Sequence, residues 1–325
     1  MKVLVTGANG LLGHHVVMEL LNRKHDVRII VRSSERIYFD LTKVELFIGD
    51  FTVEQNFENA AKGCEAVIHI AAITATNLLQ YSDYSAVNVV SNEMIVGVCK
   101  RLNIKRIVFV SSANTIGYGT SEHLSNELAP IQYPFTKSFY AQSKLRAEEI
   151  YQKASNPSEN HFIIVNPSFM IGAYDVKPSS GKLLLMGWRK RLLFVPRGGK
   201  NFVATADVAT SICNALTLGT SGERYLLSGV NLTFKEFYKL QSRVGGYQQT
   251  IIELPDMLLE LVAKLGDLLQ MLGVKTDVCS RNINQLTICE YYTNEKAKAT
   301  LRHPTTSIEL AIRESMDWFK ANAYL

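Results

Sequence analysis

The sequence predicts an α/β fold in which a doubly wound parallel sheet carries a smaller mixed α/β lobe. Short β-branched runs alternate with amphipathic stretches through the first half of the chain, which is the pattern of βαβ units. A glycine-rich turn follows the first run directly. After Asn166 and Pro167 the alternation gives way to segments punctuated by Pro and Gly. These observations indicate one sheet domain and one less regular lobe.

The predicted elements of the sheet domain follow from the period of the apolar residues. Strand candidates are short runs rich in Val and Ile, at residues 2–6, 27–31, 44–48, 66–70, 106–110 and 162–165. Helix candidates between them cover residues 12–23, 53–62, 82–102 and 138–153. Each helix candidate is long enough for a right-handed crossover between parallel strands.

The looser part of the chain after Pro167 predicts a second lobe, and within this part helices are expected at 207–218 and 233–244. We assign residues 1–168 and 201–228 to the sheet domain, and residues 169–200 and 229–325 to the lobe. Because no long linker separates the two parts, we expect them to pack closely with a cleft between them.

Composition excludes several classes of protein. The chain has 325 residues, of which 47% are hydrophobic and 20% charged, with 20 Gly and 8 Pro. This is the mix of an ordinary globular protein, so disorder and collagen-like repeats are excluded. The net charge of +5 is spread along the chain, so no nucleic-acid-binding tail is expected.

The cysteines indicate the redox compartment, the histidines whether a metal is bound, and the hydropathy whether a helix crosses a membrane. The five cysteines are widely spaced without a CxxC pair, and an apolar strand candidate follows Met1 in place of a signal segment. We therefore expect reduced thiols and a cytoplasmic protein. The most apolar helix candidate, residues 257–272, is too short and too charged for a bilayer that needs about 20 apolar residues. Because no Cys/His cluster has metal-ligand spacing, no metal site is expected.

The glycine-rich turn carries the strongest functional signal. The first strand candidate runs directly into Thr6-Gly7-Ala8-Asn9-Gly10-Leu11-Leu12-Gly13, which opens the first helix candidate. Gly7 permits the tight turn, Gly10 lets a pyrophosphate approach the positive end of the helix, and Gly13 allows close helix–strand packing. The sheet domain is thus predicted to be a Rossmann-type dinucleotide-binding domain. Its first contacts with the dinucleotide are expected from Gly7, Asn9, Gly10, Leu11, Leu12 and Gly13.

The end of the second strand indicates which dinucleotide is bound. Arg32 follows that strand, with no acidic residue at its tip to bind a free ribose hydroxyl. Because a guanidinium matches a phosphate in charge and geometry, NADP is favoured, with NAD as the alternative. After the third strand candidate, Asp50 and Phe51 are candidates for the adenine side, although Asp50 could equally cap the next helix.

A Tyr and a Lys four residues apart on one helix share a face. The spacing occurs at Tyr133 and Lys137, at Tyr140 and Lys144, and at Tyr292 and Lys296. A proline interrupts the first pair, and the third straddles an expected helix cap. Only the middle pair lies within a predicted helix, whose start is expected near the carboxyl ends of the strands, where ligands bind in such sheets.

This pair suits proton transfer during hydride transfer. A phenol with a pKa near about 10 is a poor base, and the ammonium of Lys144 is expected to lower the pKa of Tyr140. The remaining donors of Lys144 could hold the nicotinamide ribose. Ser111 and Ser112 end the fifth strand at the same edge, and these observations do not separate them. A serine-hydrolase site is excluded because no Gly-x-Ser-x-Gly elbow is present.

Taken together, the glycine turn, Ser111-Ser112, Tyr140-Ala141-Gln142-Ser143-Lys144 and Asn166-Pro167-Ser168 resemble the extended short-chain dehydrogenase/reductase family over nearly the whole chain. The segments at residues 171–184 and 222–229 resemble its dihydroflavonol-reductase-like branch, which includes proteins called NAD-dependent epimerases. The resemblance implies a Ser/Tyr/Lys triad and selects Ser112, five positions before Gly117. It further implies cofactor contacts from Ala71, Ala72, Ile73, Pro167 and Phe169.

Two further points rest on the resemblance. A histidine that is usual in the family is replaced here by Ala204, three residues before Asp207. The role that this histidine has between the lobes in relatives is therefore not expected in this chain. The long helices at 82–102 and 138–153 form a dimer interface in relatives, which implies a homodimer.

Three functions compete for this pattern. The leading hypothesis is an NADP-dependent oxidoreductase acting on a ketone, an aldehyde or a secondary alcohol, with Ser112, Tyr140 and Lys144 as catalytic residues. The alternative is a nucleotide-sugar epimerase or dehydratase with tightly held NAD. A dinucleotide sensor without catalysis would have no use for the triad. Basic residues of the second lobe are either diphosphate ligands or solvated charges, namely Arg189, Lys190, Arg191, Arg197 and Lys200.

Overall fold

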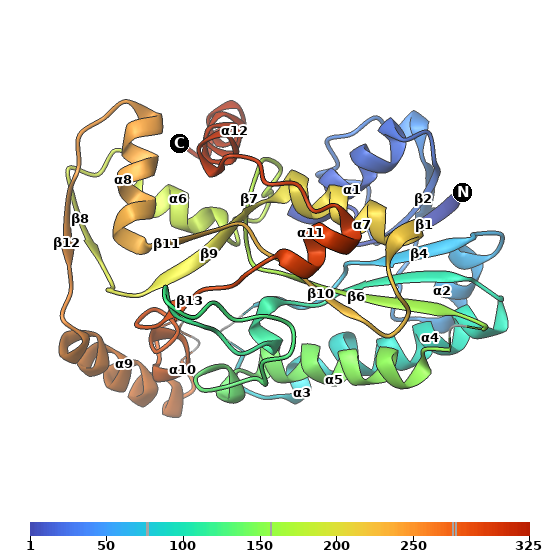
Figure 1. Ribbon diagram of the computed structural model, residues 1–325, viewed down its shortest axis with the longest axis horizontal. Helices are drawn as coiled ribbons and strands as arrows, with labels where there is room; N and C mark the ends of the chain where they lie inside the picture. Colours follow the sequence, from blue (N-terminus) through green and yellow to red (C-terminus); the bar gives the residue numbers. More distant parts are fainter. Residues whose placement is uncertain (76–77, 157, 275, 277) are drawn as a thin grey trace.

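The computed structural model describes residues 1–75, 78–156, 158–274, 276 and 278–325, and it consists of a large sheet domain and a smaller lobe (Figure 1). The large sheet is seven-stranded, in the order β10-β6-β5-β4-β1-β2-β3, and every pairing in it is parallel. Its strands are β1 (Lys2–Thr6), β2 (Asp26–Val31), β3 (Glu45–Ile48), β4 (Ala66–His69), β5 (Arg106–Val110), β6 (His161–Pro167) and β10 (Arg224–Leu227). The predicted doubly wound parallel sheet is confirmed.

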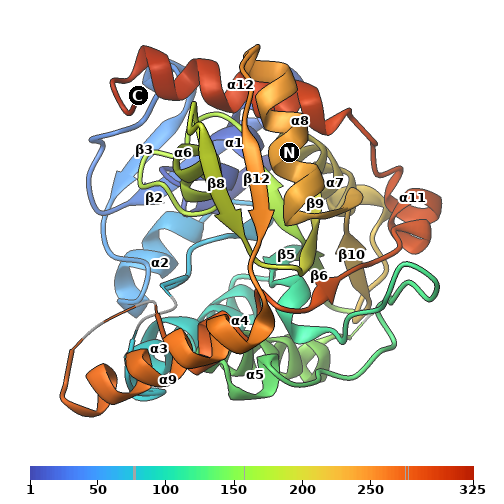
Figure 2. The same cartoon turned by 90° about the vertical axis from the view of Figure 1, so that its left-hand side faces the viewer.

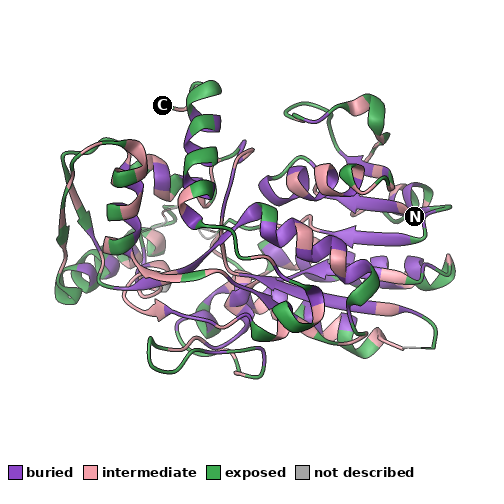
Figure 3. Ribbon diagram, turned by 45° about the horizontal axis from the view of Figure 1, so that its top comes forward, coloured by how far each residue is buried: buried purple, intermediate pink, exposed green. Residues whose placement is uncertain are grey.

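Helices cover both faces of this sheet because its strands carry apolar residues on both sides (Figures 1 and 3). Val3 and Val5 of β1 point into one core, and Leu4 points into the other. The first core is covered by α1 (Leu11–Asn22), α7 (Thr205–Leu218) and α11 (Glu295–Leu301). The second is covered by α2 (Glu54–Ala61), α4 (Ser91–Arg101) and α5 (Phe139–Ala154).

The helix predicted at residues 82–102 is present but is not uniform. It begins as α3 (Ser82–Ser85), passes through a π-helical segment (Ala86–Val90) and continues as α4. Such a π turn widens the helix and often marks a functional position. Short 3-10 turns at Leu41–Lys43, Ala113–Thr115 and Phe135–Lys137 complete the sheet domain.

The smaller lobe is built on a mixed four-stranded sheet. Its strands β7 (Phe169–Ile171), β11 (Val230–Thr233) and β13 (Cys289–Glu290) all pair with β9 (Gly199–Ala204), and only β11 does so antiparallel. A core of large aromatic residues joins this sheet to α6 (Gly181–Gly187), α8 (Phe234–Gly245) and α12 (Ile308–Ala321). The lobe ends in a parallel pair, β8 (Leu192–Val195) with β12 (Thr250–Glu253), and in α9 (Asp256–Met271) and α10 (Ser280–Ile283) (Figures 1 and 2).

The chain passes between the two parts more than once. Strand β9 belongs to the sheet of the lobe, although α7 directly after it packs on the large sheet. Helix α11 returns from the lobe to cover the same face as α7. The division into residues 1–168 with 201–228 and 169–200 with 229–325 stays a prediction. Among the described helices, none is long and apolar enough to cross a membrane.

Candidate active site

The glycine turn between β1 and α1 has the geometry that its sequence predicts. Gly7 adopts a left-handed φ of +72°, and a Cβ there would lie 2.8 Å from the backbone nitrogen of Ala71. A Cβ on Gly13 would lie 2.0 Å from the carbonyl oxygen of Gly7. A side chain at Gly13 would therefore force α1 away from the turn, and a side chain at Gly7 would collide with the segment after β4.

The residues of this turn fit a dinucleotide pyrophosphate. Helix α1 starts at Gly10 without a side-chain cap and with no acidic residue in its first turn. The first N–H groups of a helix have no acceptor within the helix, so those of Leu11 and Leu12 are available to a phosphate. The side chains of Leu11 and Leu12 are buried in the core, which leaves only their backbone to contact the cofactor. Asn9 and Gly10 are exposed at the mouth of the turn.

Arg32 and Asp50 lie near each other beyond β2 and β3. Arg32 is exposed directly after β2. Hydrogen bonds from Thr52 lower the pKa of Asp50, and the positive charge of Arg32 lowers it further. The carboxylate of Asp50 accepts from the backbone nitrogen and the hydroxyl of Thr52 at 2.9 and 2.8 Å, so it holds the turn before α2. Phe51 packs edge-on against His69, with 5.4 Å between ring centroids.

The segment after β4 is held by a buried asparagine in the π turn. Asn88 accepts from the backbone nitrogen of Ile73 at 2.8 Å and donates to its carbonyl at 3.0 Å. It also donates to the hydroxyl of Ser143 on α5 at 3.0 Å. Ala71, Ala72 and Ile73 are half-buried. Asn88 thus fastens a predicted cofactor contact to the helix that carries Tyr140.

Tyr140 lies in the first turn of α5, where Ser138 caps the helix by accepting from the backbone nitrogen of Ala141. Its hydroxyl shares a hydrogen bond with the side chain of Ser112. Burial raises the pKa of Tyr140 to about 12, and the bond to Ser112 opposes this rise. The sequence predicted a lowered pKa. That prediction differs from the structure because the phenol is buried and the ammonium of Lys144 is directed elsewhere.

Lys144 is buried one turn after Tyr140. Its Nζ donates to the carbonyl of Val110 at 2.6 Å, at the end of β5, and lies 4.3 Å from the ring centroid of Phe109. Burial lowers the pKa of Lys144 to about 7, and the nearby carboxylate of Glu148 works in the opposite direction. The amine of Lys144 therefore lies at the edge of the sheet and gains or loses a proton near neutral pH.

The two serines that the sequence did not separate have different partners. Ser111 is buried and donates to Glu148, whereas Ser112 faces Tyr140 and accepts from the backbone nitrogen of Asn114 at 3.2 Å. The structure therefore brings Ser112, and not Ser111, to the phenol.

Glu148 is a site residue that the sequence reasoning missed. One of its carboxylate oxygens accepts from Ser111, from Thr115 at 2.6 Å and from the amide of Asn166 at 2.6 Å. Its other oxygen accepts from Arg224 at 3.3 Å. The carboxylate therefore ties α5 to β5, β6 and β10 at the carboxyl edge of the sheet. Its signal was its position four residues after Lys144, on the buried face of the helix.

The remaining candidates lie at the junction with the lobe. Pro167 ends β6 in the core, and Phe169 in β7 packs edge-on against Phe202 with 5.5 Å between ring centroids. Ala204 is buried at the start of α7. Asp207 accepts from the backbone nitrogen and the hydroxyl of Thr306, at 2.7 and 2.6 Å. Asp207 therefore fastens α7 to the segment before α12.

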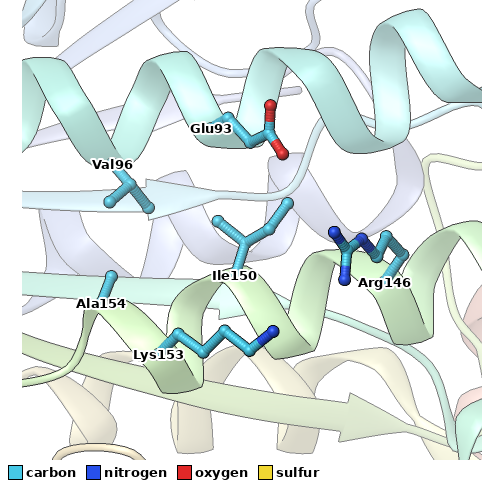
Figure 4. A pocket seen from close by; sticks show the side chains of 6 residues that line it. All are labelled: Glu93, Val96, Arg146, Ile150, Lys153 and Ala154. Atoms are coloured by element: carbon cyan, nitrogen blue, oxygen red, sulfur yellow. The ribbon is translucent and has the colours of Figure 1, made fainter.

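The two other Tyr/Lys pairs do not form such a site. Tyr133 is exposed before Pro134, outside α5, and Tyr292 is buried with its hydroxyl 3.5 Å from the carbonyl of Ala113. A hollow between α4 and α5 is also separate, because it is lined from the exposed side of α5 (Figure 4). Its residues are Glu93, Val96, Arg146, Ile150, Lys153 and Ala154.

The structure brings the predicted residues to one edge of the sheet. The glycine turn follows β1, Arg32 follows β2, Asp50 follows β3, Ala71 follows β4 and Ser112 follows β5. Because all these strands are parallel, their carboxyl ends meet along one edge, where ligands bind in open α/β sheets. A dinucleotide stretched from Arg32 to Ser112 would thus lie across the glycine turn. In the described part of the chain, no cluster of His, Cys, Asp or Glu could hold a metal ion.

Comparisons with known proteins agree with this geometry. Residues 3–227 match the NAD dependent epimerase/dehydratase family. A protein of Synechocystis named "Putative dihydroflavonol 4-reductase" is 28% identical over 99% of this chain and 95% of its own length. Sterol demethylase protein B of Methylococcus capsulatus is 30% identical, over 83% of this chain and 82% of its own.

A solved structure of a nucleoside-diphosphate-sugar epimerase from Pseudomonas aeruginosa has the same fold. It aligns with a TM-score of 0.76 at 22% identity, over 100% of this chain and 99% of that one. The chain therefore belongs to the NAD-dependent epimerase/dehydratase family and is an NAD(P)-dependent enzyme of the extended short-chain dehydrogenase/reductase type.

Proposed function

We propose that this enzyme is an NADP-dependent reductase that converts a ketone or aldehyde to an alcohol. The observation that carries the proposal is the hydrogen bond between Ser112 and Tyr140 at the edge where the glycine turn opens. When bound, the nicotinamide supplies or takes the hydride. The names of two relatives, a dihydroflavonol reductase and a sterol demethylase protein, are in keeping with substrates other than nucleotide sugars.

Each member of the triad has a separate task in this proposal. With its pKa raised to about 12, Tyr140 keeps its proton at neutral pH and can give it to the oxygen that becomes the alcohol. Ser112 donates to the same oxygen and polarises the carbonyl. Lys144, whose Nζ is anchored at the end of β5, would hold the nicotinamide ribose in place for hydride transfer.

Arg32 supports NADP over NAD. Arg32 is exposed after β2. Within the described residues its guanidinium forms no salt bridge with a carboxylate, although Asp50 is near. A guanidinium in this place can bind a ribose 2′-phosphate in a bidentate manner.

We expect Arg32→Asp to reverse the preference for NADPH over NADH, because it replaces the phosphate ligand by a residue that accepts from a free ribose hydroxyl. The ratio of the two dissociation constants should change by about 10²-fold, from loss of charge-assisted bonds worth roughly 1.5–3 kcal/mol. Fluorescence titration with each nucleotide measures this ratio. Arg36→Asp, in the same exposed loop, is the charge-matched control. An unchanged ratio in Arg32→Asp would show that another group reads the 2′ position.

The alternative is a nucleotide-sugar epimerase or dehydratase with tightly held NAD, which the description of the matching family favours. Such an enzyme uses the same triad for a transient oxidation and reduces the intermediate before release. Cofactor retention separates the two functions, because a reductase must exchange its nucleotide in every turnover.

We further propose a cytoplasmic homodimer joined through α4 and α5. Their exposed sides carry Arg146, Lys153 and Glu93 around the half-buried Ile150, a mixture that suits a two-fold contact (Figure 4). Sedimentation velocity should show a dimer that Ile150→Arg converts to a monomer, while the exposed control Leu128→Arg stays dimeric. A monomeric wild-type protein would contradict this proposal.

A further inference from the structure

Helix α9 carries an apolar stripe that is largely exposed. Met257, Leu261, Leu265 and Leu268 recur every three or four residues and are 55–81% exposed. Further members of the stripe are Leu258, Val262, Leu269 and Leu272. A soluble helix normally turns such a stripe to the core, so its exposure here points to a partner.

The orientation of α9 is fixed by its other faces. Leu259 and Ala263 are buried and pack with Ile283 of α10. A Cβ on Gly266 would lie 1.6 Å from the carbonyl oxygen of Val278, so helix and following segment are in close contact. The acidic side chains of α9 lie off the apolar stripe, and Asp267 is held by the backbone nitrogen of Ser280 at 2.8 Å. The apolar stripe therefore faces outward.

A second apolar surface lies at the same end of the molecule. The pair β8 and β12 presents Leu192, Phe194 and Ile252 outward, each at least 43% exposed, while Val195 is buried. Helix α9 begins at Asp256, directly after β12 ends at Glu253, so the two elements are neighbours at this end of the molecule (Figures 1 and 2). We call the outward faces of α9, β8 and β12 the apolar end.

Basic residues surround β8. Residues 186–197 include no acidic residue but contain Arg189, Lys190, Arg191 and Arg197, all of them exposed. None of the four forms a salt bridge with a carboxylate in the described part of the chain. Arg189 instead lies over the ring of Trp188, with its guanidinium carbon 5.5 Å from the centroid. This run combines cations, an aromatic ring and exposed Met186 in one surface segment.

From this combination we propose that the apolar end docks on an anionic phospholipid bilayer, with α9 lying in the plane of the interface. An amphipathic helix buries its apolar face at the boundary between headgroups and acyl chains. Arg197 follows the end of β8 that lies towards α9, whereas Arg189, Lys190 and Arg191 precede β8 at the other end of the strand pair, and all four would gain free energy from anionic headgroups. A second copy of the chain fits less well, because a two-fold contact through this end would bring the same unpaired basic run close to itself.

The proposal is independent of the reaction, since no residue of the apolar end belongs to the edge that carries Tyr140 and Ser112. It does account for the basic run, which the proposed reductase does not use. The enzyme would then be held at a membrane surface without a spanning helix.

Sedimentation of the full chain with vesicles tests the docking. We expect the wild-type protein to pellet with vesicles of phosphatidylserine and phosphatidylcholine, to bind pure phosphatidylcholine at least tenfold more weakly, and to be released by high salt. Leu261→Glu combined with Leu265→Glu should lower binding at least tenfold, as should Lys190→Glu combined with Arg191→Glu. Thermal unfolding of each variant checks that the fold is kept.

Two matched controls change other exposed sites. Leu128→Glu places a charge on an exposed leucine of the sheet domain, and Lys62→Glu with Lys100→Glu reverses two exposed charges on α2's end and α4. Both should bind vesicles as the wild type does. The proposal is overturned if the wild type does not pellet with anionic vesicles, or if the α9 variants pellet unchanged. The proposal is also overturned if the wild-type protein is a dimer that does not bind vesicles and the α9 variants convert this dimer to a monomer.

Discussion

Tyr140→Phe is expected to lower the turnover number by about 10³-fold, within the range of roughly 10²–10⁴ that a positioned proton donor contributes. The change removes only the hydroxyl oxygen, which is bonded to Ser112 and would donate to the carbonyl oxygen of the substrate. The ring keeps its place in the first turn of α5, so the dissociation constant for the cofactor should change little. Steady-state kinetics and nucleotide titration measure the two quantities separately.

The matched control is Tyr133→Phe. Tyr133 is exposed, and its hydroxyl accepts a hydrogen bond from the side chain of Asn284. The same chemical change at Tyr133 should therefore leave the turnover number unchanged. Full activity in Tyr140→Phe would end its assignment as the proton donor.

Lys144→Met is expected to weaken both cofactor binding and turnover. Methionine keeps the length and apolar stem of the side chain but removes the Nζ that donates to Val110 at the end of β5. Loss of a charged donor costs roughly 1.5–3 kcal/mol, so the dissociation constant for the nucleotide should rise about tenfold or more. The turnover number should fall as well, because the nicotinamide ribose would no longer be held in place for hydride transfer.

The dependence on pH distinguishes this role from a loss of packing. The lowered pKa of about 7 means that Lys144 is charged below neutral pH and loses its proton as the pH rises. Affinity for the anionic nucleotide should therefore fall as the pH rises through 7 in the wild type, and this part of the profile should be absent in Lys144→Met. Lys137→Met, on the exposed 3-10 turn before α5, is the control. The same pH profile in Lys144→Met and wild type would contradict the assignment.

The sheet domain could be predicted because its signals are local. Strands β1 and β5 have the bounds that the apolar runs indicated, since a buried parallel strand is a continuous run of Val and Ile between turn residues. Helices α8 and α9 of the lobe begin and end within one residue of the predicted ranges 233–244 and 257–272, but the sheet of the lobe could not be traced in this way. Strand β9 pairs with three segments that lie far apart in the sequence, and β13 is only two residues long. Pairings of this kind depend on tertiary contacts, which a local pattern does not carry.

In the candidate site, too, the features that depend on local sequence could be predicted, and those that depend on tertiary contacts could not. The glycine turn and the pair Tyr140 and Lys144 follow from spacing within one element. The distinction between Ser111 and Ser112 depends on Glu148, which lies on α5 and accepts a hydrogen bond from Ser111. The raised pKa of Tyr140 likewise depends on the burial of the phenol in the folded chain, which a sequence pattern does not report.

We propose that the sheet edge with Ser112, Tyr140 and Lys144 serves a reductase that exchanges NADP in each turnover. The most direct measurement is the identity and occupancy of nucleotide in freshly purified protein, followed by titration of the emptied protein with NADPH and NADH. We expect low occupancy and reversible binding, with NADPH bound more tightly than NADH. Near-stoichiometric NAD that stays with the protein through purification would contradict this proposal and assign the chain to the epimerases.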